Sequence, residues 1–340
     1  MQSKKKIIGN GIFLAAVFLL TVVGVFHGED LEGMMEAIRD VEKIKLVPGI
    51  ALVLFFIWGE SIILWYMMKS FGIRLKKRVC FLFSSVGFFF SCITPSASGG
   101  QPMQVYYMKK EKIPVPVAAV ILMIVTITYK LVLVVIGIGV LVLGRGFKER
   151  YLGEVLPVFY LGVLLNVFCV TFMTVLVFHP VLTERILTWG MRLLEKGRFL
   201  RHREERGRKL CNAMEVYRET AQYLEKHRKV LLGVILITFV QRFALFGVTW
   251  VVYRAFGLSG AGFWDVVMLQ AVISVSVDML PLPGGMGISE AMFLRIFPSV
   301  FQGMLLPGMV VSRGLGYYSQ LLVSALFTIV AQVYYSMRRR

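Results

Sequence analysis

Seven charged side chains lie within long apolar stretches of this chain. They are Glu60, Lys130, Arg242, Asp278, Glu290, Arg295 and Arg313. A charge surrounded by hydrocarbon is costly, so such residues face a protein interior or a water-filled cavity, where they bind ions, protons or polar substrates. Two interpretations stay open for the four deepest, Glu60, Lys130, Arg242 and Arg313: direct contact with a substrate, or pairing that holds helices together. We expect Arg295 to point outward.

Two segments rich in proline and glycine interrupt apolar stretches and lead into further helical sequence. The first is TPSASGGQP at residues 94–102, and the second is LPLPGGMGISE at residues 280–290. Irregular backbone at membrane depth is tolerated only inside protein or against a cavity. A pair of such breaks in corresponding places predicts a transport site between them. The alternative is that the glycines only permit close packing of helices.

These features define the candidate site. We expect its shape to come from Gly99, Gly100, Pro283, Gly284, Gly285 and Gly287. We expect neutral hydrogen-bond donors at Ser96, Ser98 and Gln101. Arg242 and Arg313 are candidate counter-charges for a headgroup, because helix ends and basic side chains together suit phosphate. The acids at the second break, Glu290 and Asp278, need a basic partner, with Arg313 the first choice and Arg242 the second. We assign possible coupling or pairing roles to Glu60, Lys130 and Asp278.

The elements that position these residues are those of an all-α polytopic membrane protein. The chain has 340 residues, of which 57% are hydrophobic and 17% are charged, against about 25% charged in soluble domains. Its net charge of +18 comes largely from loops beside apolar stretches. The positive-inside rule accounts for that pattern without nucleic acid as a partner. The four cysteines and four histidines show no metal-ligand spacing, and we expect neither metal nor cofactor.

Hydropathy predicts six full spans, at residues 7–26, 46–68, 115–143, 155–178, 230–256 and 305–335. The two broken segments, at residues 79–108 and 263–297, have apolar arms that are short for a crossing at 1.5 Å per residue. We expect them to form re-entrant hairpins that enter from opposite sides, which gives an inverted repeat. Eight full spans are the alternative. The charges of the loops place both termini in the cytoplasm.

One long polar segment, residues 180–230, interrupts what is otherwise a single membrane domain covering residues 1–340. Basic residues outnumber acidic ones there, and apolar residues recur at helical spacing. We expect a cytoplasmic loop with basic amphipathic helices on the anionic inner leaflet. A solvated helical hairpin is the alternative.

Three stretches resemble the family of the lysylphosphatidylglycerol synthase transmembrane region. They are Pro95-x3-Gly99-Gly100-Gln101-Pro102, Pro283-Gly284-Gly285-Met286-Gly287-Ile288-Ser289-Glu290-Ala291 and Arg313-Gly314-Leu315-Gly316-Tyr317-Tyr318. The resemblance covers about residues 7–335. It implies the flippase half of the multiple peptide resistance factor, which moves aminoacylated phosphatidylglycerol to the outer leaflet, here standing alone without the synthase domain. Gln101 departs from the family, in which this position is often acidic, and a neutral amide at this position argues against a proton or cation role for this break.

Three functions follow as hypotheses. The first is a flippase or transporter in the bacterial inner membrane for a polar-headgroup lipid: aminoacyl-phosphatidylglycerol, another phospholipid or a polyprenyl lipid. The second is lipid aminoacylation of the phosphatidylglycerol lysyltransferase type, for which the loop at 180–230 is too small to be a catalytic domain. The third is a scaffold that docks a separate cytoplasmic synthase through that loop. Membrane lipids are the expected partners, and the protein could form a homo-oligomer.

Overall fold

The computed structural model describes residues 31–143, 145–196 and 203–338. Every regular element in these ranges is a helix, as predicted. Five helical stretches are long and apolar enough to cross a membrane. They are Lys43–Ser70, Val115–Val142, Gly153–Phe178, Arg228–Ala255 and Pro298–Met337. They confirm five of the six predicted spans, and the sixth, at residues 7–26, lies outside the described residues.

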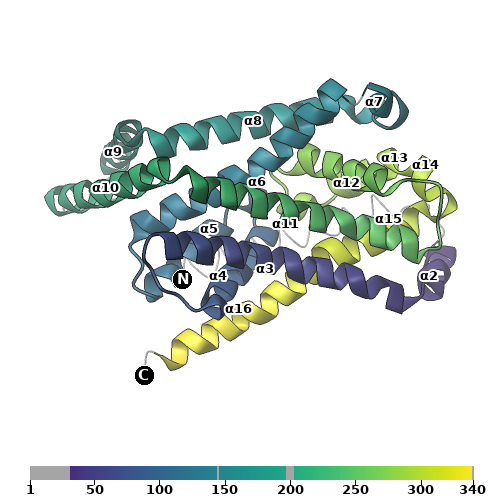
Figure 1. The fold of residues 1–340 in the computed structure, drawn as a ribbon, viewed down its shortest axis with the longest axis horizontal. Helices are drawn as coiled ribbons and strands as arrows, with labels where there is room; N and C mark the ends of the chain where they lie inside the picture. Colours follow the sequence, from purple (N-terminus) through teal and green to yellow (C-terminus); the bar gives the residue numbers. More distant parts are fainter. Residues whose placement is uncertain (1–30, 144, 197–202, 339–340) are drawn as a thin grey trace.

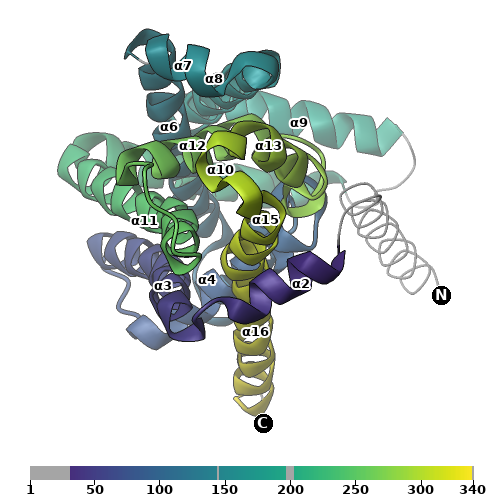
Figure 2. The same cartoon turned by 90° about the vertical axis from the view of Figure 1, so that its right-hand side faces the viewer.

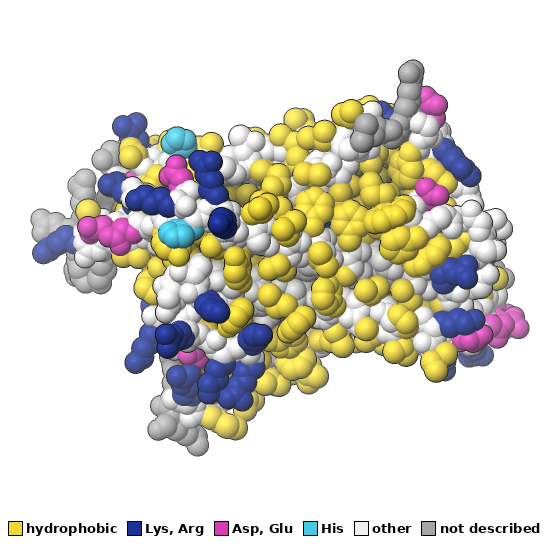
Figure 3. All heavy atoms as spheres, in the orientation of Figure 1, with side chains coloured by type: hydrophobic (Ala, Val, Ile, Leu, Met, Phe, Trp, Pro, Cys, Tyr) yellow, Lys and Arg dark blue, Asp and Glu magenta, His cyan; other side chains and the backbone are white. Residues whose placement is uncertain are grey.

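The long helices run side by side along the longest axis of the molecule (Figure 1). They are α3 (Val47–Ser70), α6 (Val115–Leu143), α8 (Leu156–Phe178), α11 (Arg228–Ala255) and α16 (Ser319–Met337). In the end view of Figure 2, α8 and α16 lie on opposite sides of the molecule. Hydrophobic side chains cover the middle of the surface, and the charged side chains gather at its two ends (Figure 3). This distribution is that of a protein whose waist lies in hydrocarbon.

Each predicted break joins two short helices through a 3₁₀ turn. The first unit is α4 (Lys77–Cys92), η2 (Pro95–Ala97) and α5 (Gly100–Lys110). The second is α12 (Phe263–Val277), η4 (Pro283–Gly285) and α13 (Ile288–Ile296). Each 3₁₀ turn begins with a proline, and the residue after it has a positive φ, 50° at Ser96 and 56° at Gly284, so the chain reverses. The two units extend from opposite ends of the molecule (Figure 1), and their turns contact each other.

The packing of these elements is reciprocal. The first helix of one unit, α4, packs against α16, and the first helix of the other, α12, packs against α6. Between them α3 lies along α11. An inverted repeat predicts this exchange, because each hairpin then lies against the last span of the other repeat.

The last span is not a continuous α-helix. It consists of α15 (Leu305–Arg313), a π-helical turn η6 (Gly314–Tyr318) and α16. A π-helical turn shifts the register of the side chains that follow it and is frequent at functional sites. Here the turn coincides with the arginine–aromatic stretch singled out in the sequence.

The predicted polar loop forms two helices, α9 (Pro180–Lys196) and α10 (Arg203–Lys226). Helix α10 packs on α6, and two of its tyrosines bond to helix ends: the hydroxyl of Tyr217 donates to the carbonyl of Leu176 (3.1 Å) and that of Tyr223 to the carbonyl of Ser70 (2.6 Å). Helix α9 leaves apolar side chains exposed, among them Trp189. The remaining short elements are α2 (Leu31–Asp40), η1 (Lys43–Leu46), α7 (Arg145–Tyr151), η3 (Gly153–Val155), α14 (Pro298–Phe301) and η5 (Gln302–Met304).

Candidate functional site

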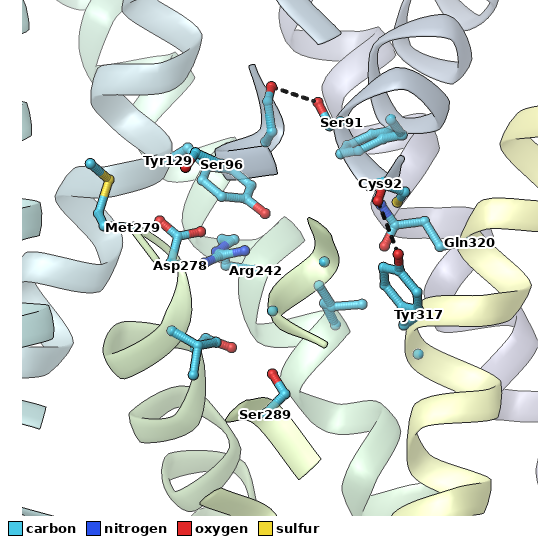
Figure 4. A pocket seen from close by; sticks show the side chains of 18 of the residues that line it. Ser91, Cys92, Ser96, Tyr129, Arg242, Asp278, Met279, Ser289, Tyr317 and Gln320 are labelled. Carbon is cyan, nitrogen blue, oxygen red and sulfur yellow. Dashed lines mark hydrogen bonds between the residues drawn. The ribbon is translucent and has the colours of Figure 1, made fainter. Parts of the chain in front are cut away.

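A cavity of about 490 Å³ lies where the two breaks meet. Its walls come from both broken units and from α3, α6, α8, α11 and the last span. Figure 4 shows side chains from these elements directed into the space between the turns. Ten of the predicted site residues line it: Glu60, Ser96, Ser98, Gln101, Lys130, Arg242, Asp278, Gly284, Gly285 and Arg313.

The other five predicted residues do not line the cavity. They are Gly99, Gly100, Pro283, Gly287 and Glu290. A methyl group on Gly100 would overlap the hydroxyl of Ser91 and lie 2.7 Å from the carbonyl oxygen of Gly87. Gly100 therefore allows α5 to begin against α4, which is the close-packing role that glycines alone would have.

Arg313 fastens the second break to the last span. Its Nε donates to Glu290 Oε1 (2.7 Å) and its Nη2 to the carbonyl oxygen of Gly284 (3.1 Å). The other oxygen of Glu290 accepts from the backbone N–H of Gly287 (2.7 Å), at the start of α13. The guanidinium also lies 4.7 Å from the ring centroid of Tyr317. Arg313 is thus the basic partner that we expected for Glu290, and its charge is already compensated.

Lys130 on α6 forms an ion pair with Asp278 at the end of α12. Both side chains are mostly buried, and both line the cavity. The partner of Asp278 is therefore Lys130 and not an arginine. The pairing ties span α6 to the second broken unit.

Arg242 on α11 is buried, with 3% of its surface exposed. Its Nε and Nη2 have no hydrogen-bond partner among the described residues. The guanidinium stacks on Tyr129, 3.7 Å from the ring centroid, and Figure 4 shows the two side chains together at the cavity wall. Buried N–H groups without partners are rare and costly in native structures, so Arg242 is the clearest position for an anionic ligand.

Glu60 on α3 is also buried, with 8% of its surface exposed. Its Oε1 accepts a hydrogen bond from Gln104 Nε2 (2.7 Å), and within the described part of the chain no lysine or arginine nitrogen lies within 4.0 Å of it. Gln104 also donates to the carbonyl of Phe83 (3.3 Å). Gly87 makes room for it, because a Cβ there would overlap the Gln104 amide.

The first break contributes fewer free donors than we predicted. The Gln101 side chain donates to Thr126 and to the carbonyl of Leu122 (3.4 Å), so its amide is bound to α6. Ser96 and Ser98 line the cavity and are exposed. They remain the available hydroxyl groups of this turn.

Sequence reasoning missed several polar residues of the wall. They are Gln104, Tyr129, Gln270, Ser274, Ser312, Tyr317 and Gln320. Helical spacing could have found some of them: Gln104 lies one turn after Gln101, and Gln270 and Ser274 precede Asp278 at intervals of four residues. The hydroxyl of Tyr317 donates to the carbonyl of Cys92 (3.0 Å), which joins the last span to the end of α4.

Two arginines on helices that contribute to the bundle, Arg295 and Arg254, do not line the cavity. Arg295 on α13 is exposed, as we expected. Arg254, at the end of α11, donates to the carbonyl of Leu258 (3.1 Å). Over residues 31–143, 145–196 and 203–338, no group of three or more His, Cys, Asp or Glu side chains forms a metal-binding cluster.

Comparisons with known proteins were informative about the family of this chain. A search of curated proteins gave no match. The family model described as "Lysylphosphatidylglycerol synthase TM region" matches residues 7–324, which include both breaks, Arg242 and the π-helical turn. Because the match covers most of the 340 residues, the chain belongs to the family of the lysylphosphatidylglycerol synthase transmembrane region.

Proposed function

We propose that this protein moves a polar-headgroup lipid between the leaflets of the bacterial inner membrane. The observation that carries the proposal is the cavity between the two breaks, midway along an apolar bundle and lined by Arg242, Lys130, Asp278 and Glu60. The family itself connects the chain with lysylphosphatidylglycerol-related lipid handling. Aminoacyl-phosphatidylglycerol, another phospholipid or a polyprenyl lipid would fit this proposal.

The size of the cavity favours a headgroup as its occupant. Sites for small ligands have volumes of roughly 300–1,000 Å³, and the cavity of about 490 Å³ falls in that range. In this proposal the headgroup passes through the cavity while the acyl chains stay in the surrounding lipid. The polar wall replaces the water that the headgroup loses, which lowers the barrier to crossing hydrocarbon.

Re-entrant hairpins would give this cavity two routes of access. The helices of the broken units have 16, 11, 15 and 9 residues, so even the longest rises only about 24 Å against about 30 Å of hydrocarbon. The units come from opposite ends and meet at their turns. We propose that movement of one turn opens the cavity to one leaflet and movement of the other turn opens it to the other leaflet.

The proposed orientation puts the end that carries α9, α10 and the C-terminus in the cytoplasm. Lys109, Lys110 and Arg338 lie at this end, together with the basic residues of α10, and Figure 3 shows many basic side chains there. This placement follows the positive-inside rule. The exposed apolar side chains of α9 fit a helix in the inner leaflet, and a docked synthase would meet the same surface.

The alternative of lipid aminoacylation has less support from the geometry. Aminoacyl-tRNA is large and highly charged, whereas the described cavity lies at the centre of an apolar bundle. The scaffold alternative predicts a stable protein that moves no lipid. A transport assay therefore separates both alternatives from the proposal.

The test is a scrambling assay in proteoliposomes. Fluorescently labelled phosphatidylglycerol, phosphatidylethanolamine, lysyl-phosphatidylglycerol and a polyprenyl phosphate are each incorporated, and a membrane-impermeant quencher reports the fraction moved between leaflets. We expect at least one lipid to move with the wild-type protein, and Arg242→Gln to slow it about tenfold or more, as loss of a charged hydrogen bond implies. Arg295→Gln, an exposed arginine, is the matched control. If no lipid moves faster than in protein-free vesicles, the proposal is wrong.

A further inference from the structure

Not all the charged side chains around the cavity are paired with one another. Its ionisable side chains include three bases and three acids, counting Glu290, which pairs with Arg313. Two ion pairs, Lys130–Asp278 and Arg313–Glu290, account for four of them. Arg242 and Glu60 remain, one of each sign, and neither has an ion-pair partner among the described residues.

The environment of Arg242 suits a phosphodiester. A guanidinium presents a planar fork of N–H groups that matches two phosphate oxygens, and two of its nitrogens are free of partners in the described structure. Tyr129 stacks on one face at 3.7 Å and Phe246 lies 5.2 Å from it. The ring of Tyr129 holds the guanidinium by stacking, while its Nε and Nη2 are buried without hydrogen-bond partners in the described structure.

The environment of Glu60 suits an ammonium group. The carboxylate is oriented by a hydrogen bond from Gln104. Gln104 is itself positioned by its hydrogen bond to the carbonyl of Phe83 and by its close packing against the backbone of Gly87. Two other basic side chains of the cavity are already paired with acids: Lys130 with Asp278, and Arg313 with Glu290. A buried carboxylate is stabilised by a cation that donates hydrogen bonds to it, and a primary amine supplies both.

Both residues line the same cavity. Glu60 on α3 and Arg242 on α11 lie on helices that pack along each other, and the ring of Tyr129 contacts both helices, through Arg242 (3.7 Å) and through Phe56 on α3 (6.4 Å between ring centroids). A purely anionic headgroup would satisfy Arg242 and leave Glu60 unpaired. A purely cationic group would do the reverse. A headgroup that carries a phosphate and an amine on a short linker satisfies both at once.

We propose that the cavity is a zwitterion site in which Arg242 binds the phosphodiester of a lipid headgroup and Glu60, positioned by Gln104, binds its amine. The inference rests on the proposed function, since it names the headgroup class, and it assigns to Glu60 the choice between amine-bearing and amine-free lipids. The requirement is for an amine and a phosphate together, whatever group links them.

The test measures binding and requires no transport. Wild-type protein in detergent micelles is titrated with three short-chain lipids: phosphatidylethanolamine, its N-acetyl derivative, in which the amine is neutral, and phosphatidylglycerol. Native mass spectrometry gives the relative affinities. We expect phosphatidylethanolamine to bind roughly tenfold or more tightly than the other two, as a charge-assisted hydrogen bond implies. This arm needs no variant, so it stands even if a substitution impairs folding.

The variants assign the preference to residues. Glu60→Gln keeps the size and the bond to Gln104, and we expect it to abolish the preference for the amine while the N-acetyl lipid binds as before. Arg242→Gln weakens the binding of all three lipids by a similar factor. Glu154→Gln and Arg295→Gln, which change exposed residues away from the cavity, are the matched controls.

Two results overturn the inference: equal binding of phosphatidylethanolamine and its N-acetyl derivative to the wild-type protein, or an undiminished preference in Glu60→Gln. These results differ from failure of the proposed function. A protein that shows the binding preference but moves no lipid in vesicles contradicts the transport proposal and retains the zwitterion site.

Discussion

The bond network of Arg313 allows a quantitative prediction about how the second break is held. Arg313 bonds to Glu290 (2.7 Å) and to the carbonyl of Gly284 (3.1 Å), and Glu290 caps the N–H of Gly287 (2.7 Å). Removing one partner of a buried pair costs about 3–5 kcal/mol, because the other charge stays unpaired. The Arg313 side chain is 18% exposed. We therefore expect Arg313→Gln to lower the free energy of unfolding by about 3 kcal/mol, the lower end of that range.

Substitution of Glu290, the acidic partner of Arg313, should lower the free energy of unfolding by less. Glu290→Gln retains an amide oxygen that can accept the bond from Gly287, so it should cost about 1.5–3 kcal/mol, the value of a charge-assisted hydrogen bond. The double variant leaves no uncompensated charge. The free energy of unfolding that the double variant loses should therefore be smaller than the sum of the losses in the two single variants. We expect the difference to be about 1–3 kcal/mol, as for groups coupled in one network.

Reversible unfolding by SDS in mixed micelles, followed by circular dichroism, supplies the four free energies of the double-mutant cycle. Arg295→Gln, on the same short helix as Glu290 but exposed, is the control and should change stability by less than about 0.5 kcal/mol. Additive single losses would refute the reasoning, because they would mean that the two side chains do not interact in the folded protein.

Three further predictions concern other parts of the cavity. Gly284→Ala should lower stability in the same unfolding assay by about 2–4 kcal/mol, since its φ of +56° and the tyrosine ring packed against it leave no room for a methyl group; an unchanged midpoint would contradict this. Lys130→Gln should lower the melting temperature in detergent, because it leaves the buried charge of Asp278 unpaired, and adding Asp278→Asn should restore part of that decrease. If the double variant melts no higher than Lys130→Gln, the two side chains do not form an ion pair in the folded protein. In a variant without native thiols, Ser96→Cys should react with a water-soluble maleimide faster than Leu164→Cys, an exposed position on the apolar surface, and equal rates would show that the cavity is dry.

The cavity also suggests why the chain keeps charges in its apolar interior. Each ion pair joins elements that are far apart in the sequence: Lys130 and Asp278 are separated by 148 residues, and Glu290 and Arg313 by 23. Both pairs end at the second broken unit. They hold this unit against α6 and the last span, and thereby position the turn that meets the first break.

Local sequence properties determined the spans and the breaks. The lengths of the apolar stretches predicted the five long helices that the structure describes, because a helix rises by a fixed distance per residue and hydrocarbon has a nearly fixed thickness. The reversals at Ser96 and Gly284 come directly after Pro95 and Pro283, because proline cannot continue a helix beyond its first turn. The π-helical turn at residues 314–318 was not predicted, because a single inserted residue leaves the hydropathy pattern almost unchanged.

The partners of the charged residues were decided by tertiary structure. The sequence presented Arg313 and Arg242 as candidate counter-charges for a headgroup and Lys130 as a possible pairing residue, but it did not show that Lys130 is the partner of Asp278. Packing of α6 on α12 and of the last span on the second turn neutralised two of these bases and left Arg242 free. Hydropathy and the conformational preferences of turn residues depend on residues that are adjacent in the chain. Ion pairs depend on residues that are adjacent in space, and only the folded structure determines which charged residues are adjacent in space.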